Sequence, residues 1–203
     1  MIKTIVVDLG GVYFEAGTRI ALQKIYRLLN VPKENVDEIF EGYPRKEGFL
    51  YRKGKLTKEK FWKAAVKKLK IDKKMVLRLQ EIWHSSYKPI KGMKELITRL
   101  RKNYRVLVFS GNIKERIKYL NRKYNLKEDF DDFIFSFDFG FNKKEIEFYT
   151  ILLKRIVCRP EECIIIDDVQ EFLDTARSFG LKTILFKNPN QLKSDLKKFG
   201  VKI

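Results

Sequence analysis

The stretch Ile5-Val6-Val7-Asp8-Leu9-Gly10-Gly11-Val12 decides the fold prediction. Three apolar residues predict a buried β-strand, and Asp8 follows them directly, ahead of a glycine turn. A carboxylate at the end of a buried strand is costly unless it does chemistry or binds a cation. Asp8 is therefore the first candidate for a functional residue.

Two further apolar runs end in polar residues. Val106-Leu107-Val108-Phe109 leads into Ser110-Gly111-Asn112, and Ile164-Ile165-Ile166 leads into Asp167-Asp168. Ligands of open parallel sheets bind at the carboxyl ends of the strands. We therefore expect all three strand ends to meet at one site.

The pattern of elements along the chain predicts an α/β fold. Residues 3–8 predict a strand, and 17–85 show helical periodicity only. After Pro89, helices and strands alternate, with helices expected at 91–103, 114–124, 145–157, 169–179 and 189–199 and strands at 105–109, 133–135, 163–167 and 182–186. This alternation predicts a Rossmann-like parallel sheet with helices on both faces.

The helical stretch predicts an inserted α-helical cap domain. We assign residues 16–87 to the cap and residues 1–15 and 88–203 to the α/β core. Expected cap helices are 18–30, 33–42, one that Thr57 caps and that ends at Leu69, and one that Asp72 caps. A cap inserted directly after the first strand would cover the site, exclude water and select substrates. Tyr43, Arg45, Tyr51 and Arg52 are candidates to face the crevice, and a surface loop is the equally weighted alternative.

These residues together suit phosphoryl transfer. Asp8 can attack an electrophile, and Asp8 and Asp167 can share a hard cation such as Mg²⁺. The Ser110 hydroxyl, a lysine ammonium and the backbone amides that follow the two strands can hold phosphoryl oxygens. The candidates for the backbone contacts are Leu9, Gly10, Gly111 and Asn112. The residues thus predict Mg²⁺-dependent phosphoryl transfer through an aspartyl-phosphate.

Four ordered segments resemble the motifs of the haloacid dehalogenase superfamily, in the subgroup with a cap between the first and second motifs. They are Asp8-Leu9-Gly10-Gly11-Val12, Phe109-Ser110-Gly111-Asn112, Gly140-Phe141-Asn142-Lys143-Lys144-Glu145 and Ile166-Asp167-Asp168. The resemblance implies a nucleophile at Asp8 and phosphate binding by Ser110 and Lys143. It also implies Mg²⁺ on Asp8, Asp167 and the Gly10 backbone carbonyl, with Asp168 as a supporting carboxylate.

Three positions depart from the pattern of that family. Gly10 stands where most of its phosphatases carry an acid/base aspartate, although some members resemble this chain in having glycine there. Glu15 is the nearest candidate to replace that group. The family's Lys-Pro is Lys143-Lys144 here, which leaves open which lysine contacts phosphate. Phe172, with Glu171 beside it, stands where an Asn or Asp usually follows the acidic pair.

Composition bounds the partners and the setting. The 203 residues carry a net charge of +18, but Lys and Arg are spread along the chain, so we favour a solvated basic surface that attracts small anionic substrates over a nucleic-acid partner. The 34% of charged residues fits a heat-adapted, thermophilic protein or a compositional bias of its source.

Cys158 and Cys163 predict reduced thiols, with a bridge across their short loop as the alternative. The sequence shows no signal peptide or membrane span, so we expect a cytoplasmic protein with no membrane partner.

The leading functional hypothesis is a phosphatase for small phosphate monoesters such as sugar phosphates. One alternative is a haloacid dehalogenase that uses Asp8 without a metal, a reaction for which Gly10 is sufficient. Another is a catalytically weakened relative that binds phospho-ligands or nucleic acid. His84 is the only histidine and is expected to be a packed or solvated helix residue. The sequence leaves the oligomeric state open.

Overall fold

A computed structural model describes residues 1–41 and 46–203 of the chain. Within these residues the chain forms a five-stranded parallel sheet of order β3-β2-β1-β4-β5. The strands are β1 Thr4–Val7, β2 Arg105–Ser110, β3 Asp132–Phe135, β4 Cys163–Asp167 and β5 Lys182–Leu185. Val7, at the end of β1, pairs with Val108 of β2 and Ile166 of β4, so the carboxyl ends of the central strands lie level. The predicted Rossmann-like parallel sheet is confirmed.

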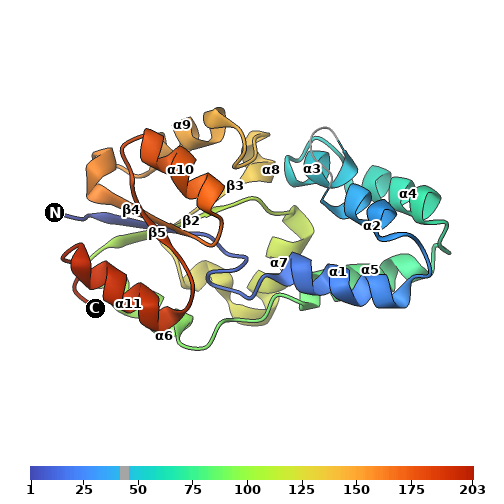
Figure 1. Cartoon of the computed structure of the whole chain (residues 1–203), viewed down its shortest axis with the longest axis horizontal. Helices are drawn as coiled ribbons and strands as arrows, with labels where there is room; N and C mark the ends of the chain where they lie inside the picture. Colours follow the sequence, from blue (N-terminus) through green and yellow to red (C-terminus); the bar gives the residue numbers. More distant parts are fainter. Residues whose placement is uncertain (42–45) are drawn as a thin grey trace.

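Alternating strand residues supply two separate cores, one on each face of the sheet. Ile5 and Val7 pack with apolar residues of α6, α7 and α11, whereas Val6 packs with α9 and α10. The helix bounds are α6 Met93–Leu100, α7 Lys114–Tyr124, α9 Ile146–Arg155, α10 Gln170–Ser178 and α11 Pro189–Lys198. Figure 1 shows α9 and α10 on one side of the sheet and α6 and α11 on the other. Helices therefore cover both faces, as the sequence predicts.

The helices between β1 and α6 extend beyond the carboxyl edge of the sheet (Figure 1). They are α1 Gly17–Leu28, α2 Lys33–Phe40, α3 Glu47–Arg52, α4 Lys58–Leu69 and α5 Met75–Ser85. These helices have a core of their own, in which the rings of Phe40, Phe61 and Trp83 pack closely. His84 packs against Trp83 and Tyr119, and burial lowers its pKa to about 3. This helical layer lies where the sequence predicts the cap and is called the cap below; its role as a separate domain with limits at residues 16 and 87 stays a prediction.

The structure corrects some of the expected elements. α3 and the short α8, Ser136–Phe139, were not predicted, because six or fewer residues show too little periodicity to identify a helix. Asp72 does not cap α5: its carboxylate accepts from the backbone N–H of Lys74 at 2.8 Å, in a turn that precedes the helix start at Met75. Thr57 does cap α4, since its hydroxyl accepts from the Lys60 N–H at 3.3 Å.

Three remaining expectations concern the cysteines, the membrane and two of the proposed crevice residues. Cys158 and Cys163 are both free thiols, and the Cys158 thiol donates to the Thr4 hydroxyl at 3.4 Å. Among the described residues, no helix combines the length and apolar character needed to span a bilayer. Tyr43 and Arg45, two of the proposed crevice residues, lie outside the described residues.

The aromatic core of the cap generates a stability prediction. Phe61 is fully buried and packs against four rings, so Phe61→Ala should lower the free energy of unfolding by about 3–5 kcal/mol. Urea denaturation followed by tryptophan fluorescence measures this change. Leu77→Ala is the matched control, because that side chain is 74% exposed and should change stability little. Equal effects of the two substitutions would contradict the assignment of this core.

Candidate active site

Three carboxylates meet at the carboxyl edge of the sheet. Asp8 follows β1, Asp167 ends β4, and Asp168 is the next residue; one oxygen from each lies within 4.8 Å of the others. The parallel pairing of β1 with β4 continues one residue past β1, because the Asp8 N–H donates to the Ile166 carbonyl at 3.0 Å. The two neighbouring strands thus hold Asp8 beside the acidic pair.

Lys143 joins the two strand ends. Its ammonium lies 2.7 Å from the Asp8 carboxylate and 2.6 Å from that of Asp167, and the residue is only 3% exposed. Burial by itself would lower the pKa of Lys143, but the charges of Asp167 and Asp8 outweigh burial and raise it above its ordinary value. Lys144 instead forms an ion pair with Glu171 at 3.4 Å. Lys143 is thus the lysine whose ion pair joins it to the proposed nucleophile, and Lys144 lines the same cavity.

Three carboxylates converge here, and among the ion pairs of the described residues only Lys143 joins them, through Asp8 and Asp167. Burial raises the pKa of Asp167, and the charge of Asp8 raises it further, against the opposing effect of Lys143. Burial and Asp8 also raise the pKa of Asp168. Converging carboxylate oxygens with unbalanced charge suit a hard cation, and Mg²⁺ prefers such ligands together with water and phosphate oxygens. The residues present therefore fit a magnesium ion.

The turn after Asp8 requires glycine at position 11. Gly11 has φ +93°, and a Cβ there would lie 2.2 Å from a carboxylate oxygen of Asp168. Its backbone N–H donates to the Phe14 carbonyl at 2.7 Å, which closes the turn. The absence of a side chain at Gly11 is what allows the first and last motifs to approach each other.

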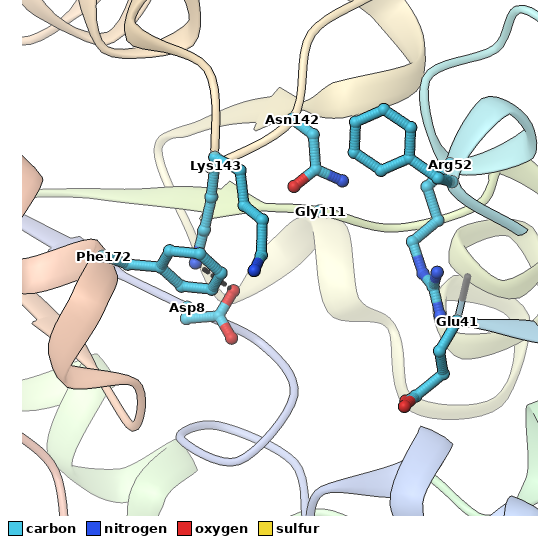
Figure 2. Close-up of a pocket in the computed structure, with 9 residues that line it drawn as sticks. Asp8, Glu41, Arg52, Gly111, Asn142, Lys143 and Phe172 are labelled. Carbon is cyan, nitrogen blue, oxygen red and sulfur yellow. Dashed lines mark ion pairs between the residues drawn. The ribbon is translucent and has the colours of Figure 1, made fainter. Parts of the chain in front are cut away.

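A cavity of about 390 Å³ opens next to Asp8 and Lys143. Its other lining residues are Glu41, Phe49, Arg52, Gly111, Asn142, Lys144 and Phe172 (Figure 2). Arg52, one of the crevice candidates, does line the cavity. Tyr51 does not, because its ring stacks on Phe61 and its hydroxyl donates to Glu115 at 2.7 Å. The ring of Phe172 also faces this site, with its centre 5.6 Å from the Lys143 ammonium.

The second motif contributes mainly backbone to this cavity. Gly111 lines it, whereas Ser110 and Asn112 are 2% and 1% exposed. The Asn112 side-chain oxygen accepts from Arg116 at 3.0 Å, and its backbone N–H donates to the Ser136 hydroxyl at 3.0 Å. The side-chain oxygen and the backbone N–H of Asn112 are thus both bonded within the protein. Leu9 is likewise fully buried in the core.

Gly10 lies close against the ring of Tyr87. A Cβ at this position would lie 3.1 Å from the ring of Tyr87, whose hydroxyl accepts from Arg116 at 3.1 Å and lies 2.9 Å from the Thr18 hydroxyl. Glu15, the sequence-based substitute, is exposed and is not part of the cavity lining. Sequence reasoning missed Tyr87 and Arg116. The available signal was the four-residue spacing of Asn112, which precedes α7, and Arg116 in its first turn.

The contact of Gly11 with Asp168 generates a prediction. Gly11→Ala should destabilise the fold by more than the roughly 1–2 kcal/mol of a left-handed alanine, because its Cβ also displaces Asp168. Gly92→Ala is the matched control: Gly92 has φ +87° and nothing within 4 Å of the Cβ position. Thermal unfolding of both variants separates the two costs. Equal losses would mean that Asp168 does not constrain the turn.

The geometry agrees with comparisons to known proteins. The structure resembles a HAD family enzyme from Bacteroides thetaiotaomicron, solved in complex with magnesium and inorganic phosphate, at TM-score 0.78 and 20% identity, over 93% of this chain and 96% of that chain. It also resembles an L-2-haloacid dehalogenase from Xanthobacter autotrophicus with chloropropionic acid covalently bound, at TM-score 0.65 and 15% identity, over 100% and 85% of the two chains. These likenesses show the shared fold.

One sequence relative and one family model match this chain. An uncharacterised protein of Dictyostelium discoideum is 30% identical over 168 residues, which are 79% of this chain and 69% of that protein. The family model described as haloacid dehalogenase-like hydrolase matches residues 22–186. The chain therefore belongs to the haloacid dehalogenase-like hydrolase family.

Proposed function

We propose that this hydrolase is a Mg²⁺-dependent phosphatase that acts on small phosphate monoesters through an aspartyl-phosphate on Asp8. The observation that carries the proposal is the set of groups at the cavity: Asp8, the ammonium of Lys143 at 2.7 Å from it, and Asp167 and Asp168 within metal-binding reach. A nucleophile, a fixed positive charge and a cation site are the parts that phosphoryl transfer requires.

The reaction has two displacement steps. A carboxylate oxygen of Asp8 attacks phosphorus, the P–O bond to the alcohol breaks, and the alcohol leaves with a proton from water. Water then attacks phosphorus, and phosphate departs as the Asp8 carboxylate is restored. Lys143 holds Asp8 in place and offsets negative charge next to it throughout. The backbone at Gly111, which lines the cavity, supplies contacts for the phosphoryl oxygens in this proposal.

Magnesium would be held by Asp8, Asp167 and the Gly10 backbone carbonyl, with Asp168 in support. When bound, the ion supplies positive charge to the phosphoryl oxygens. The chain's own residues favour this assignment, because Lys143 pairs with Asp8 and Asp167 while a third carboxylate, Asp168, lies beside them. The structural relative with magnesium and inorganic phosphate supports the same choice.

The acidic pair also weighs against the metal-free dehalogenase alternative. Attack by Asp8 on a carbon–halogen bond needs neither Asp167 nor Asp168, so nothing in that chemistry explains why three carboxylates converge. The structural likeness to a haloacid dehalogenase fits the fold, and the Gly10 substitution suits that reaction as well. Metal dependence distinguishes the two activities.

Phosphate release from a panel of monoesters tests the proposal. Turnover should require Mg²⁺, vanish with excess chelator, and fall on the order of 10⁴-fold or more in Asp8→Asn. Asp174→Asn is the matched control, because it also removes an aspartate charge but lies exposed on α10, away from the cavity. Turnover that persists without metal or without Asp8 would overturn the proposal. Halide release from 2-haloacids would then be measured.

The absence of an acid beside Asp8 generates a second prediction. Because Gly10 and Tyr87 leave no carboxylate there, the leaving oxygen receives no proton from a positioned acid. Esters of acidic alcohols should therefore react faster than alkyl esters, by about 10²–10⁴-fold in kcat/KM. Comparing p-nitrophenyl phosphate with glycerol 3-phosphate measures this difference. Similar values for the two would show that another group donates the proton.

A further inference from the structure

The cavity has two charged ends. Figure 2 shows Asp8 and Lys143 on one side and Arg52 and Glu41 on the other, with open space between them. Arg52 is the last residue of α3 in the cap, whereas Asp8 follows the central strand of the sheet. A ligand that fills this space would therefore contact the proposed nucleophile at one end and a guanidinium at the other.

Among the described residues, no side chain pairs with the Arg52 guanidinium. Within the described part of the chain it forms no hydrogen bond or ion pair, and the charge of Glu41 reaches it only from beyond ion-pair distance. Arg52 is half-buried where it lines the cavity, and this burial lowers its pKa. A half-buried cation without a counter-ion is expected where an anionic ligand binds.

A second guanidinium lies nearby and is also incompletely paired. Arg116 is fully buried between the rings of Trp83 and Tyr87, at 4.6 and 4.4 Å from their centres. Only its Nη1 donates hydrogen bonds, to Tyr87 and Asn112, while Nε and Nη2 have no partner among the described residues. Burial and the charge of Arg52 lower the pKa of Arg116 to about 10.

Two cations that repel each other in a partly buried environment destabilise the protein unless an anion lies between or beside them. Glu41 is the acid on this side of the cavity lining, and it forms no ion pair there with Arg52. The positive potential at this end is therefore only partly balanced. An anion bound by Arg52 would relieve the repulsion and gain charge-assisted hydrogen bonds from its planar guanidinium.

We propose that Arg52, supported by the positive charge of Arg116, binds a second anionic group of the substrate while the phosphoryl group lies at Asp8. The substrate class is then a small phosphate monoester that also carries a carboxylate or a second phosphate. A cavity of about 390 Å³ suits a molecule of a few carbons with both groups. This assignment rests on the proposed phosphatase activity and narrows it.

Matched substrates test the assignment. The first pair is 3-phosphoglycerate and glycerol 3-phosphate, which differ by a carboxylate, and the second is fructose 1,6-bisphosphate and fructose 6-phosphate, which differ by a phosphate. In each pair that binds, the wild-type kcat/KM should favour the doubly anionic member, and Arg52→Gln should reduce this preference by about 10- to 100-fold. The two pairs separate a carboxylate site from a phosphate site.

Two further variants control for charge. Arg27→Gln removes the same charge from the exposed face of α1 in the cap, outside the cavity lining, and should keep the wild-type preference. Glu41→Gln removes the negative charge at the Arg52 end and should increase the preference for the doubly anionic substrate. If Arg52 served only to hold Glu41, both substitutions would instead lower the preference.

The outcomes separate this inference from the proposed function. No preference in the wild-type enzyme, an equal loss on both members of a pair, or the same loss in Arg27→Gln would overturn the Arg52 site while the phosphatase stands. If no monoester is hydrolysed, the phosphatase proposal fails. Calorimetric titration of the wild-type and Arg52→Gln proteins with 3-phosphoglycerate then decides the site, since equal binding to both would overturn it as well.

Discussion

The rest of this structure depends on the paired contact of Lys143 with Asp8 and Asp167. These three side chains come from the end of β1, the end of β4 and the segment before α9, and they meet at 2.6–2.7 Å. In a buried place, each carboxylate alone would carry an unfavourable charge, and the ammonium would as well. Each makes the charges of the others tolerable. Lys143 forms no ion pair with Asp168 among the described contacts, so the proposal places a cation beside the charge of that third carboxylate.

The order of strands makes this contact possible. β1 lies between β2 and β4, so Asp8 at its end has the loop that follows β2 on one side and the acidic pair on the other. The turn at Gly11 brings the chain over Asp168 before it leaves for the cap. The cap helices, with their own aromatic core, then place α3 opposite the sheet edge. Sheet order, turn and cap thus each fix one wall of the cavity.

The sequence predicted the parts of the site that follow strand ends, because an apolar run that stops at Asp8 or at Asp167 carries a strong local signal. It predicted the parallel sheet for the same reason, and the register of the pairing agrees. It could not choose between Lys143 and Lys144, since that choice depends on how one loop packs against two strands. It also missed α3 and the inward orientation of Asn112, which arise from contacts with residues distant in the sequence. Local pattern determines the strands, whereas tertiary packing determines which neighbouring side chains reach the cavity.

A side chain fills the space beside Gly10. The ring of Tyr87 fills it, and hydrogen bonds to Arg116 and Thr18 hold the hydroxyl, so residues of the cap, the segment between cap and core, and α7 meet there. A side chain at position 10 would require the Tyr87 ring to shift. The same network holds Arg116 under the cap, near the cavity wall that carries Arg52. The loss of a proton donor near Asp8 and the gain of positive charge at the opposite end of the cavity therefore arise from one arrangement of side chains. In this view the enzyme relies on how it binds the whole substrate more than on proton transfer to the leaving group.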